Sequence, residues 1–363
     1  MTYNWQQSDW PHFQYQTDGL TDSLFAFAES AGRISAFFEN LPEALQMDAL
    51  INTMVAEAVK TSEIEGEMIS REDVISSIKN NLGLHPEHQP VKDKRAQGIA
   101  ELMLDVRSSF ADPMDEAMLF RWHSMLMKGN TKINKGQWRS HHEPMQVISG
   151  GMGRETIHFE APPSSQVPTE MQGFIAWFNS YQLTIKNPVI RSAIAHLYFE
   201  SVHPFEDGNG RIGRAISEKA LAQGLERPVL LSLSRTIENN KRAYYEALKQ
   251  AQRSNEITPW LAYFTEMSRS AQLQAEEEVR FTIRKAQFFD RLKGQLNDRQ
   301  VRVIQRMMAE GPGGFQGGMS AKKYMAIAKT SKATATRDLQ DLSEKGVFIS
   351  IGGGRSTHYQ LEI

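Results

Sequence analysis

The segment from His203 to Arg214, HPFEDGNGRIGR, concentrates residue types that suit phosphate chemistry. Gly208 and Gly210 flank Asn209, and because glycine tolerates positive φ, successive backbone N–H groups can turn toward one concavity. The segment also opens a helix, whose N-terminus favours an anion. Its two arginines stand three residues apart and share one face of that helix, where paired guanidinium groups suit a polyphosphate.

An acid and an imidazole accompany this cradle. Asp207 stands at the loop entrance, and a carboxylate that faces bound phosphates is a reasonable ligand for Mg²⁺. His203 ends the preceding helix, and an imidazole that accepts a proton near neutral pH suits a general base for a hydroxyl group. The alternative is an ordinary polar turn with a structural histidine, because Asp-Gly-Asn-Gly is a good turn sequence by itself. A turn alone does not explain why all these groups converge.

These residues resemble the signature of the Fic (filamentation induced by cAMP) family, H-x-F-x-[D/E]-G-N-G-R-x-x-R, at every specified position. The flanking stretches AIAHLYFESV and ENNKRAYYEAL also look like those of the family, and the resemblance covers about residues 40 to 270. It implies an all-α fold, a helical bundle with a β-hairpin flap over the active site. Members that transfer phosphate depart from the Gly-Asn-Gly pattern, which this sequence keeps.

The resemblance implies an enzyme that transfers AMP from ATP to a tyrosine, threonine or serine hydroxyl of a protein, with ATP and Mg²⁺ as cofactors. His203 would take the proton from the hydroxyl, and Asp207 would hold Mg²⁺. Tyr244 and Tyr245 would either stack on adenine or pack in the core. The nucleotide-binding residues implied by the family, with Phe205 as the core anchor that fixes the loop, are Phe205, Gly208, Asn209, Gly210, Arg211 and Arg214.

An upstream stretch, Thr61 to Gly66, matches a second family pattern, [S/T]-x-x-x-E-[G/N]. The resemblance implies that Glu65 pairs with Arg214 and inhibits the enzyme, because a carboxylate competes directly with phosphate for a guanidinium group. Taken alone, the stretch is more simply a solvated glutamate before a C-cap glycine, and the full signature downstream is what favours the inhibitory role. Some related proteins use the same glutamate to position water and remove AMP, and the sequence does not choose between the two directions.

A β-hairpin is predicted over Gln146–Ile148 and Thr156–Phe159, around a turn rich in glycine (Gly150, Gly151 and Gly153). By resemblance, this flap pairs its edge with the target segment by β-augmentation. The candidate docking residues are Val147, Ile148, Ile157, His158 and Phe159.

The C-terminal part changes character. Leu296–Ile363 holds ten Lys or Arg and six Asp or Glu, a difference of +4. Two short helices are predicted at 319–328 and 332–346, and two strands follow in VFISIGGGRSTHYQLEI, with Arg355 in the turn. This order indicates a helix-turn-helix with a wing, and Lys332 and Arg337 near a helix start suit phosphate and groove contacts with DNA. Protein contacts are the alternative use of such a module.

The composition limits the kinds of protein in which these motifs can occur. The chain has 363 residues, a net charge of −2, 40% apolar and 23% charged residues, which is typical of a soluble protein of two or three domains. It has no cysteine, which excludes disulfides, cysteine-ligated metals and thiol catalysis. No apolar run could span a membrane, and the N-terminus does not read as a signal peptide, so we expect a cytoplasmic protein.

The expected domains are an N-terminal helical region with the inhibitory helix (1–110), a catalytic core (111–270), a linker helix (271–295) and a winged helix (296–363). Ser70 is predicted to cap a helix that ends near Gly83. A homodimer is implied by resemblance only. Besides the autoinhibited transferase, two functions stay open: a DNA-binding regulator that senses nucleotide, and an AMP-removing enzyme that uses Glu65.

Overall fold

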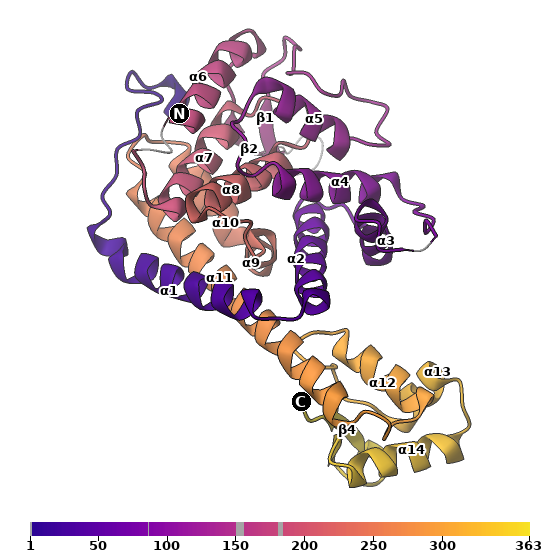
Figure 1. Ribbon diagram of the computed structural model, residues 1–363. Coiled ribbons are helices and arrows are strands. Elements are labelled where there is room, and N and C mark those ends of the chain that lie inside the picture. Colours follow the sequence, from indigo (N-terminus) through magenta and orange to yellow (C-terminus); the bar gives the residue numbers. More distant parts are fainter. Residues whose placement is uncertain (1, 86, 150–155, 181–183) are drawn as a thin grey trace. The chain divides into compact units, whose positions relative to one another are not determined.

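The computed structural model describes residues 2–85, 87–149, 156–180 and 184–363. The chain divides into two units (Figure 1). The first comprises Met1–Ser35 and Leu50–Ala275, and the second comprises Ala36–Ala49 and Glu276–Ile363. Among the described residues, no helix is both long and apolar enough to cross a bilayer.

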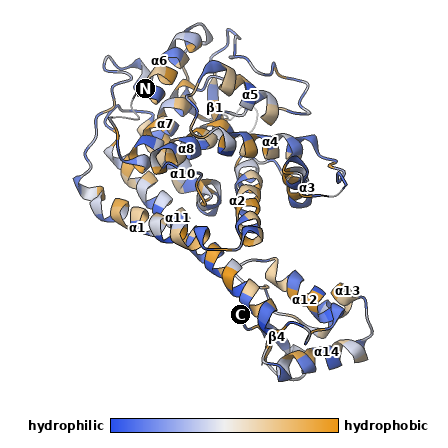
Figure 2. Ribbon diagram, in the orientation of Figure 1, coloured by the Kyte–Doolittle hydropathy of each residue, from blue (hydrophilic) through white to orange (hydrophobic). Residues whose placement is uncertain are grey.

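The first unit is mostly helical, and the strands described in it form one hairpin. Its helices carry hydrophobic and hydrophilic residues on the same element (Figure 2), as expected when one face of a helix packs inward. Helices α1, α2 and α11 each continue into the second unit. The elements are α1 (Thr21–Glu39), α2 (Glu43–Ile64), α3 (Arg71–Asn81), α4 (Lys94–Ser108), α5 (Glu116–Leu126), β1 (Gln146–Ser149), β2 (Thr156–Glu160), α6 (Val167–Ser180), α7 (Pro188–Val202), α8 (Asn209–Leu225), α9 (Leu233–Asn239), α10 (Lys241–Ala251) and α11 (Thr258–Arg291).

Helices α7 and α8 pack along each other in the middle of this unit (Figure 1). Every residue of α7 from Val189 to Val202 is buried, the polar ones among them included, which places this helix in the centre of the unit. Asn187 caps its N-terminus by accepting hydrogen bonds from the first-turn N–H groups, and Pro188 occupies the first helical position. Buried Arg191 donates to Gln223 Oε1 at 2.7 Å and so ties α7 to α8. The signature segment is the connection between these two helices.

The elements predicted from the sequence are present. Ser70 caps α3 as predicted, by accepting from Asp73 N–H. Helix α8 begins at Asn209, inside the signature segment that was expected to open a helix. Helix α9 was not predicted. Asn240 separates it from α10, because Asn240 leaves the helical conformation (φ −146°, ψ 58°) and caps α10 with its side chain.

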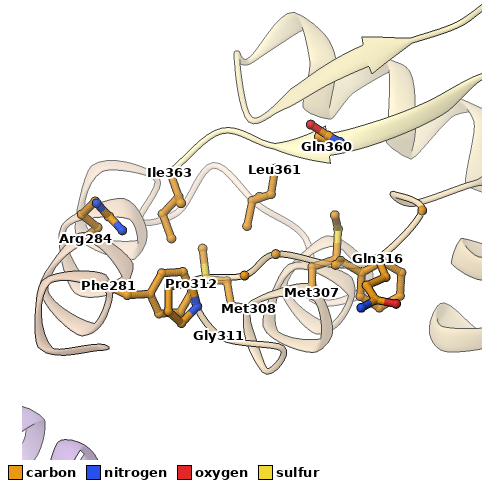
Figure 3. Close-up of a pocket in the computed structure, with 14 residues that line it drawn as sticks. Phe281, Arg284, Met307, Met308, Gly311, Pro312, Gln316, Gln360, Leu361 and Ile363 are labelled. Atoms are coloured by element: carbon orange, nitrogen blue, oxygen red, sulfur yellow. The ribbon is translucent and has the colours of Figure 1, made fainter. Parts of the chain in front are cut away.

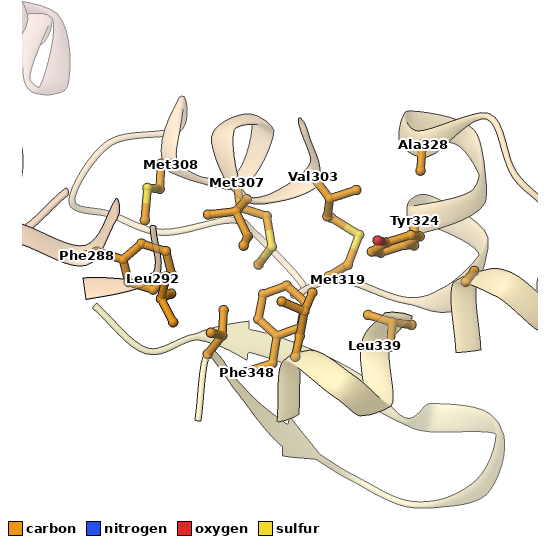
Figure 4. Packing of buried hydrophobic residues seen from close by; sticks show 14 of the residues in the cluster. Phe288, Leu292, Val303, Met307, Met308, Met319, Tyr324, Ala328, Leu339 and Phe348 are labelled. Carbon is orange, nitrogen blue, oxygen red and sulfur yellow. The ribbon is translucent and has the colours of Figure 1, made fainter. Parts of the chain in front are cut away.

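Besides the ends of α1, α2 and α11, the second unit holds α12, α13 and α14 followed by a hairpin; the last two helices and the hairpin were predicted, and α12 was not. Its own helices are joined through the buried side chains of Val303, Met307, Met319, Tyr324 and Phe348, among others (Figure 4). Met319 also forms an isolated bridge with Tyr359 of the hairpin. The elements are α12 (Asp298–Met308), α13 (Ala321–Ala328), α14 (Lys332–Glu344), β3 (Phe348–Ile351) and β4 (His358–Leu361).

A cavity of about 310 Å³ also lies within the second unit (Figure 3). It is lined by apolar side chains such as Met307, Met308 and Leu361, by the glycine-rich connection 311–317 and by Arg284. None of the predicted site residues lines it.

Buried Asp338 of α14 joins the three helices of the second unit. It accepts hydrogen bonds from Arg299 Nε of α12 at 2.8 Å and from Tyr324 Oη of α13 at 3.0 Å. Burial acts to raise the pKa of Asp338, but these hydrogen bonds and the charge of Arg299 outweigh burial and lower it.

We expect Asp338→Ala to lower the free energy of unfolding of the second unit by about 2 kcal/mol, because the donors of Arg299 and Tyr324 lose their acceptor. Hydrogen exchange of α12 and α14 measures this loss. All six tryptophans lie in the first unit, so the urea midpoint followed by tryptophan fluorescence should stay unchanged. The difference in hydrogen exchange between Asp338→Ala and the wild type should shrink as the pH falls through the lowered pKa of Asp338. Protonation of Asp338 weakens the same hydrogen bonds in the wild type. An equal loss in both units would contradict this role.

Candidate active site

The signature loop turns sharply at both of its ends. His203 ends α7 in the left-handed conformation (φ 50°, ψ 61°), with its N–H donating to Phe199 O. Gly208 starts α8 with φ 84°, and a Cβ there would lie 2.5 Å from Met127 Cε. The positive φ therefore favours glycine at 208, and any larger residue would also have to displace the end of the Met127 side chain. Since α8 begins at Asn209, the N–H groups of its first turn have no partner within the helix and suit an anion.

Asn209 closes the loop on itself. Its Nδ2 donates to Phe205 O and its Oδ1 accepts from Phe205 N, both at 2.9 Å, and the side chain is buried. This differs from the predicted phosphate contact of the Asn209 side chain, because both ends of the amide are engaged with backbone. Phe205 is buried and stacks on His123 with ring centroids 4.2 Å apart. It therefore lies in the core as an anchor and offers no surface to a nucleotide.

The imidazole of His203 has a carboxylate neighbour that the sequence reasoning missed. His203 Nδ1 lies 3.7 Å from Glu200 Oε2, one helical turn earlier on α7. Glu200 is buried, and burial acts to raise its pKa, but His203 together with the charges of His196 and Arg214 outweighs burial and lowers it. The spacing of three residues on one helix was the available signal. Because Nδ1 faces Glu200, Nε2 is the ring nitrogen left to act as a base.

Buried Arg139 fixes the same turn from a distant part of the chain. Its Nε donates to His203 O at 2.8 Å, and its Nη2 donates to Pro162 O at 2.6 Å. The residue thus joins the turn at His203 to the segment that leaves the hairpin. No pattern in the sequence singled it out.

Both signature arginines are buried and held by carboxylates. Arg214, 2% exposed, donates from Nη2 to Glu65 Oε1 at 2.7 Å and from Nε to Thr61 Oγ1 at 2.7 Å. Arg211, 4% exposed, donates from Nη1 to Glu67 Oε2 at 2.7 Å. Burial acts to lower the pKa of Arg214, but the charge of Glu65 outweighs it and raises the pKa, so the guanidinium stays charged. Sequence reasoning named Glu65 and missed Glu67.

Asp207 is half-exposed at the loop entrance. Its Oδ1 accepts from Gly208 N–H at 2.6 Å and lies 3.5 Å from Arg211 Nη2. Among the described residues, no group of three or more His, Asp or Glu side chains could hold a metal by itself. A single accessible carboxylate beside an anion-binding helix end fits an ion that also takes phosphate oxygens, as Mg²⁺ does.

The two predicted adenine-stacking tyrosines have different surroundings. Tyr244 is 1% exposed, and its Oη lies 2.6 Å from His196 Nε2. Its ring therefore packs in the core, which is the second of the two alternatives that the sequence left open for it. Tyr245 is 41% exposed and remains available for stacking.

The flap hairpin forms, and its candidate docking residues also divide into two groups. Ile148 and Ile157 are cross-strand partners with exposed side chains. Phe159 is buried against Tyr3, with ring centroids 5.0 Å apart, and Val147 packs on the same cluster. Phe159 is therefore unsuited to contact a target, contrary to expectation. His158 O accepts from Arg253 Nη2 at 3.0 Å. The turn glycines at 150, 151 and 153 lie outside the described residues.

Comparison with known families adds to this geometry. Residues 113–221 match the family model of the Fic/DOC family. The chain carries a Fic/DOC domain. Residues 3–84, which precede the Fic domain, match a domain of unknown function (DUF4172), and residues 316–362 match the C-terminal domain of DIP2311-like transcriptional regulators.

Curated relatives resemble the chain over part of their length. A protein adenylyltransferase Fic from Drosophila grimshawi is 31% identical over 123 residues, 33% of this chain and 24% of that protein. One from Drosophila yakuba is 24% identical over 255 residues, 69% of this chain and 45% of that protein. A probable protein adenylyltransferase from Aquifex aeolicus is 29% identical over 120 residues, 33% of this chain and 35% of that protein. The chain thus spans less than half the length of each.

Solved structures share the fold. A Fic family protein from Desulfovibrio desulfuricans G20 aligns with a TM-score of 0.56 and 22% identity, over 97% of this chain and 98% of that one. A signalling protein with a Fic domain from Bacteroides thetaiotaomicron aligns with a TM-score of 0.54 and 16% identity, over 71% and 97%. The predicted all-α Fic bundle is therefore confirmed as the fold.

We expect Tyr245→Ala to weaken ATP binding about fivefold through loss of stacking, without loss of stability. Tyr244→Phe should leave ATP affinity unchanged and lower the free energy of unfolding by about 1 kcal/mol, because His196 loses a partner. Isothermal titration calorimetry with ATP and Mg²⁺ and urea denaturation provide the two readouts. If Tyr244→Phe weakens ATP binding and Tyr245→Ala does not, the adenine lies at Tyr244.

Proposed function

We propose that this chain transfers AMP from ATP to the hydroxyl group of a tyrosine, threonine or serine of a protein, and that Glu65 keeps the enzyme inhibited. One observation carries the proposal: the loop that begins at His203 opens α8, and the two buried arginines of that helix pair with carboxylates that a phosphate could replace. The adenylyltransferase names of the curated relatives support the same activity.

In the proposed reaction, the hydroxyl oxygen attacks the α-phosphorus of ATP. A bond forms between that oxygen and phosphorus, the bond from the α-phosphorus to the bridging oxygen breaks, and pyrophosphate leaves. His203 Nε2 takes the hydroxyl proton. The first-turn N–H groups of α8 hold the inner phosphates, and Arg211 and Arg214 hold the outer ones. Mg²⁺ bound by Asp207 would neutralise phosphate charge. Catalysis then consists of positioning and charge stabilisation.

Inhibition follows from competition for Arg214. Its Nη2 already donates to Glu65 at 2.7 Å, so the γ-phosphate must displace a carboxylate that is in place before ATP arrives. Thr61 adds contacts from its hydroxyl and carbonyl oxygens, which hold the guanidinium in the orientation that serves Glu65. A Cβ on Gly210 would also collide with the Glu65 carboxylate, so that carboxylate lies directly over the start of α8.

We expect Glu65→Ala to raise AMP transfer at least about tenfold, because Arg214 becomes free to bind phosphate. The assay incubates the variant with lysate and ATP labelled on the α-phosphate, and mass spectrometry locates the modified hydroxyl. Label on the γ-phosphate should not transfer. Adding His203→Ala should abolish the signal.

The matched control is Glu63→Ala, which removes a carboxylate from the same helix end that pairs with Lys60. It should leave transfer at the wild-type level. If Glu65→Ala labels no protein, the transferase proposal loses its basis. If it instead abolishes release of AMP from a premodified protein that the wild type does demodify, Glu65 serves the reverse reaction.

A second candidate function concerns the C-terminal unit. We propose that α14 binds duplex DNA. Supporting this, Lys332, Thr336 and Arg337 are exposed on α14 while Ala335 and Leu339 are buried against the unit's core. The match to the C-terminal domain of transcriptional regulators favours the same use. The side chain of Arg355, in the predicted wing, lies outside the described residues.

Lys332→Ala with Arg337→Ala should weaken binding to duplex DNA in fluorescence anisotropy and lower the slope of log affinity against log salt by about 2, because two phosphate contacts are lost. Lys293→Ala with Arg302→Ala removes the same charge from exposed positions outside α14 and should change neither quantity much. If both double variants weaken DNA binding equally, only the net charge matters, and the proposal for α14 fails.

A further inference from the structure

We propose that Glu67 is a second positioning residue of the site: it holds the guanidinium of Arg211 away from the outer phosphates of ATP. Two carboxylates, at positions 65 and 67, must then leave before both signature arginines can bind phosphate. The inference rests on the proposed function, because it assigns Arg211 and Arg214 to the same polyphosphate.

A helix-ending turn brings both carboxylates to the loop. Helix α2 ends at Ile64, and Gly66 adopts φ 78°. Gly66 N–H donates to Glu63 O, and Glu67 N–H donates to Ser62 O at 2.9 Å, which is the hydrogen-bond pattern of a Schellman motif. The chain therefore reverses at Gly66 within one residue. This reversal lets residues two apart in sequence reach two arginines that stand one turn apart on α8.

Glu67 is the close partner of Arg211. Its Oε2 accepts from Nη1 at 2.7 Å, whereas Asp207 Oδ1 lies 3.5 Å from Nη2. Within the described residues, Arg211 Nε has no acceptor. The buried charge of Arg211 is therefore balanced mainly by Glu67. The Glu67 side chain is 30% exposed, so it can turn toward water while the arginine stays in place.

Arg211 and Arg214 differ in the hydrogen-bond acceptors that each keeps when its carboxylate partner moves away. Arg214 keeps the hydroxyl and carbonyl oxygens of Thr61 as acceptors. The remaining contact of Arg211 among the described residues is the long one to Asp207, the proposed Mg²⁺ ligand. Arg211 without Glu67 therefore gains more from an incoming phosphate than Arg214 does without Glu65. Removal of Glu65 alone should leave part of the inhibition in place.

The test is a double-mutant cycle of Glu65→Gln and Glu67→Gln in the full chain. Glutamine keeps an acceptor for each arginine and removes the competing charge. The probe is ATP with Mg²⁺, measured by isothermal titration calorimetry in a His203→Ala background so that nothing turns over. We expect that adding Glu67→Gln to the Glu65→Gln chain tightens ATP binding about a further tenfold. In chains with His203 intact, it should lower KM for ATP with little change in kcat.

Glu63→Gln is the matched control, because the Glu63 carboxylate pairs with Lys60, and it should leave ATP affinity unchanged. Urea denaturation followed by tryptophan fluorescence checks that each variant is folded. Unchanged or weaker ATP binding in Glu67→Gln would overturn the proposal for Glu67. Tighter ATP binding without any AMP transfer would leave Glu67 in its role and count against the proposed transferase activity instead, so the two failures are distinguishable.

Discussion

The site depends on two buried arginines at the start of α8, whose charges must always be balanced. A guanidinium group out of contact with water needs an anion beside it, and both carboxylates and phosphates meet that need. In this structure the anions are Glu65 and Glu67, from the end of α2. ATP offers phosphates to the same groups. The site therefore has two competing states. In one, the chain's own carboxylates occupy the arginines, and in the other, nucleotide does.

The rest of the first unit fixes the positions of the groups that take part in this competition. Because α7 is buried from Val189 onward, its last turn is held in place, and Arg139 fixes the backbone of His203 by donating to its carbonyl oxygen. The amide of Asn209 closes the loop on Phe205, whose ring is locked against His123. The loop backbone is thus set before any ligand binds. Preorganisation of this kind is what phosphoryl transfer requires, since its catalysis is mostly positioning.

Much of the site could be read from the sequence because its groups lie in one continuous stretch. The turn, the helix that follows it and the shared face of Arg211 and Arg214 all follow from local spacing. Contacts between distant segments could not be read in this way: Arg139 and Glu67 reach the loop only through the fold. Tyr244 and Tyr245 are adjacent, and only the packing of α10 decides which ring is buried. The short helix α9 was missed as well, because its seven residues carry too few turns for a clear helical pattern.

A crystal structure of the Glu65→Gln chain with ATP and Mg²⁺ tests the central claim most directly. Our account predicts phosphate oxygens against the first-turn N–H groups of α8 and the guanidinium of Arg214, with His203 Nε2 facing the α-phosphorus. Phosphates bound elsewhere, with the arginines still turned toward the end of α2, would contradict it.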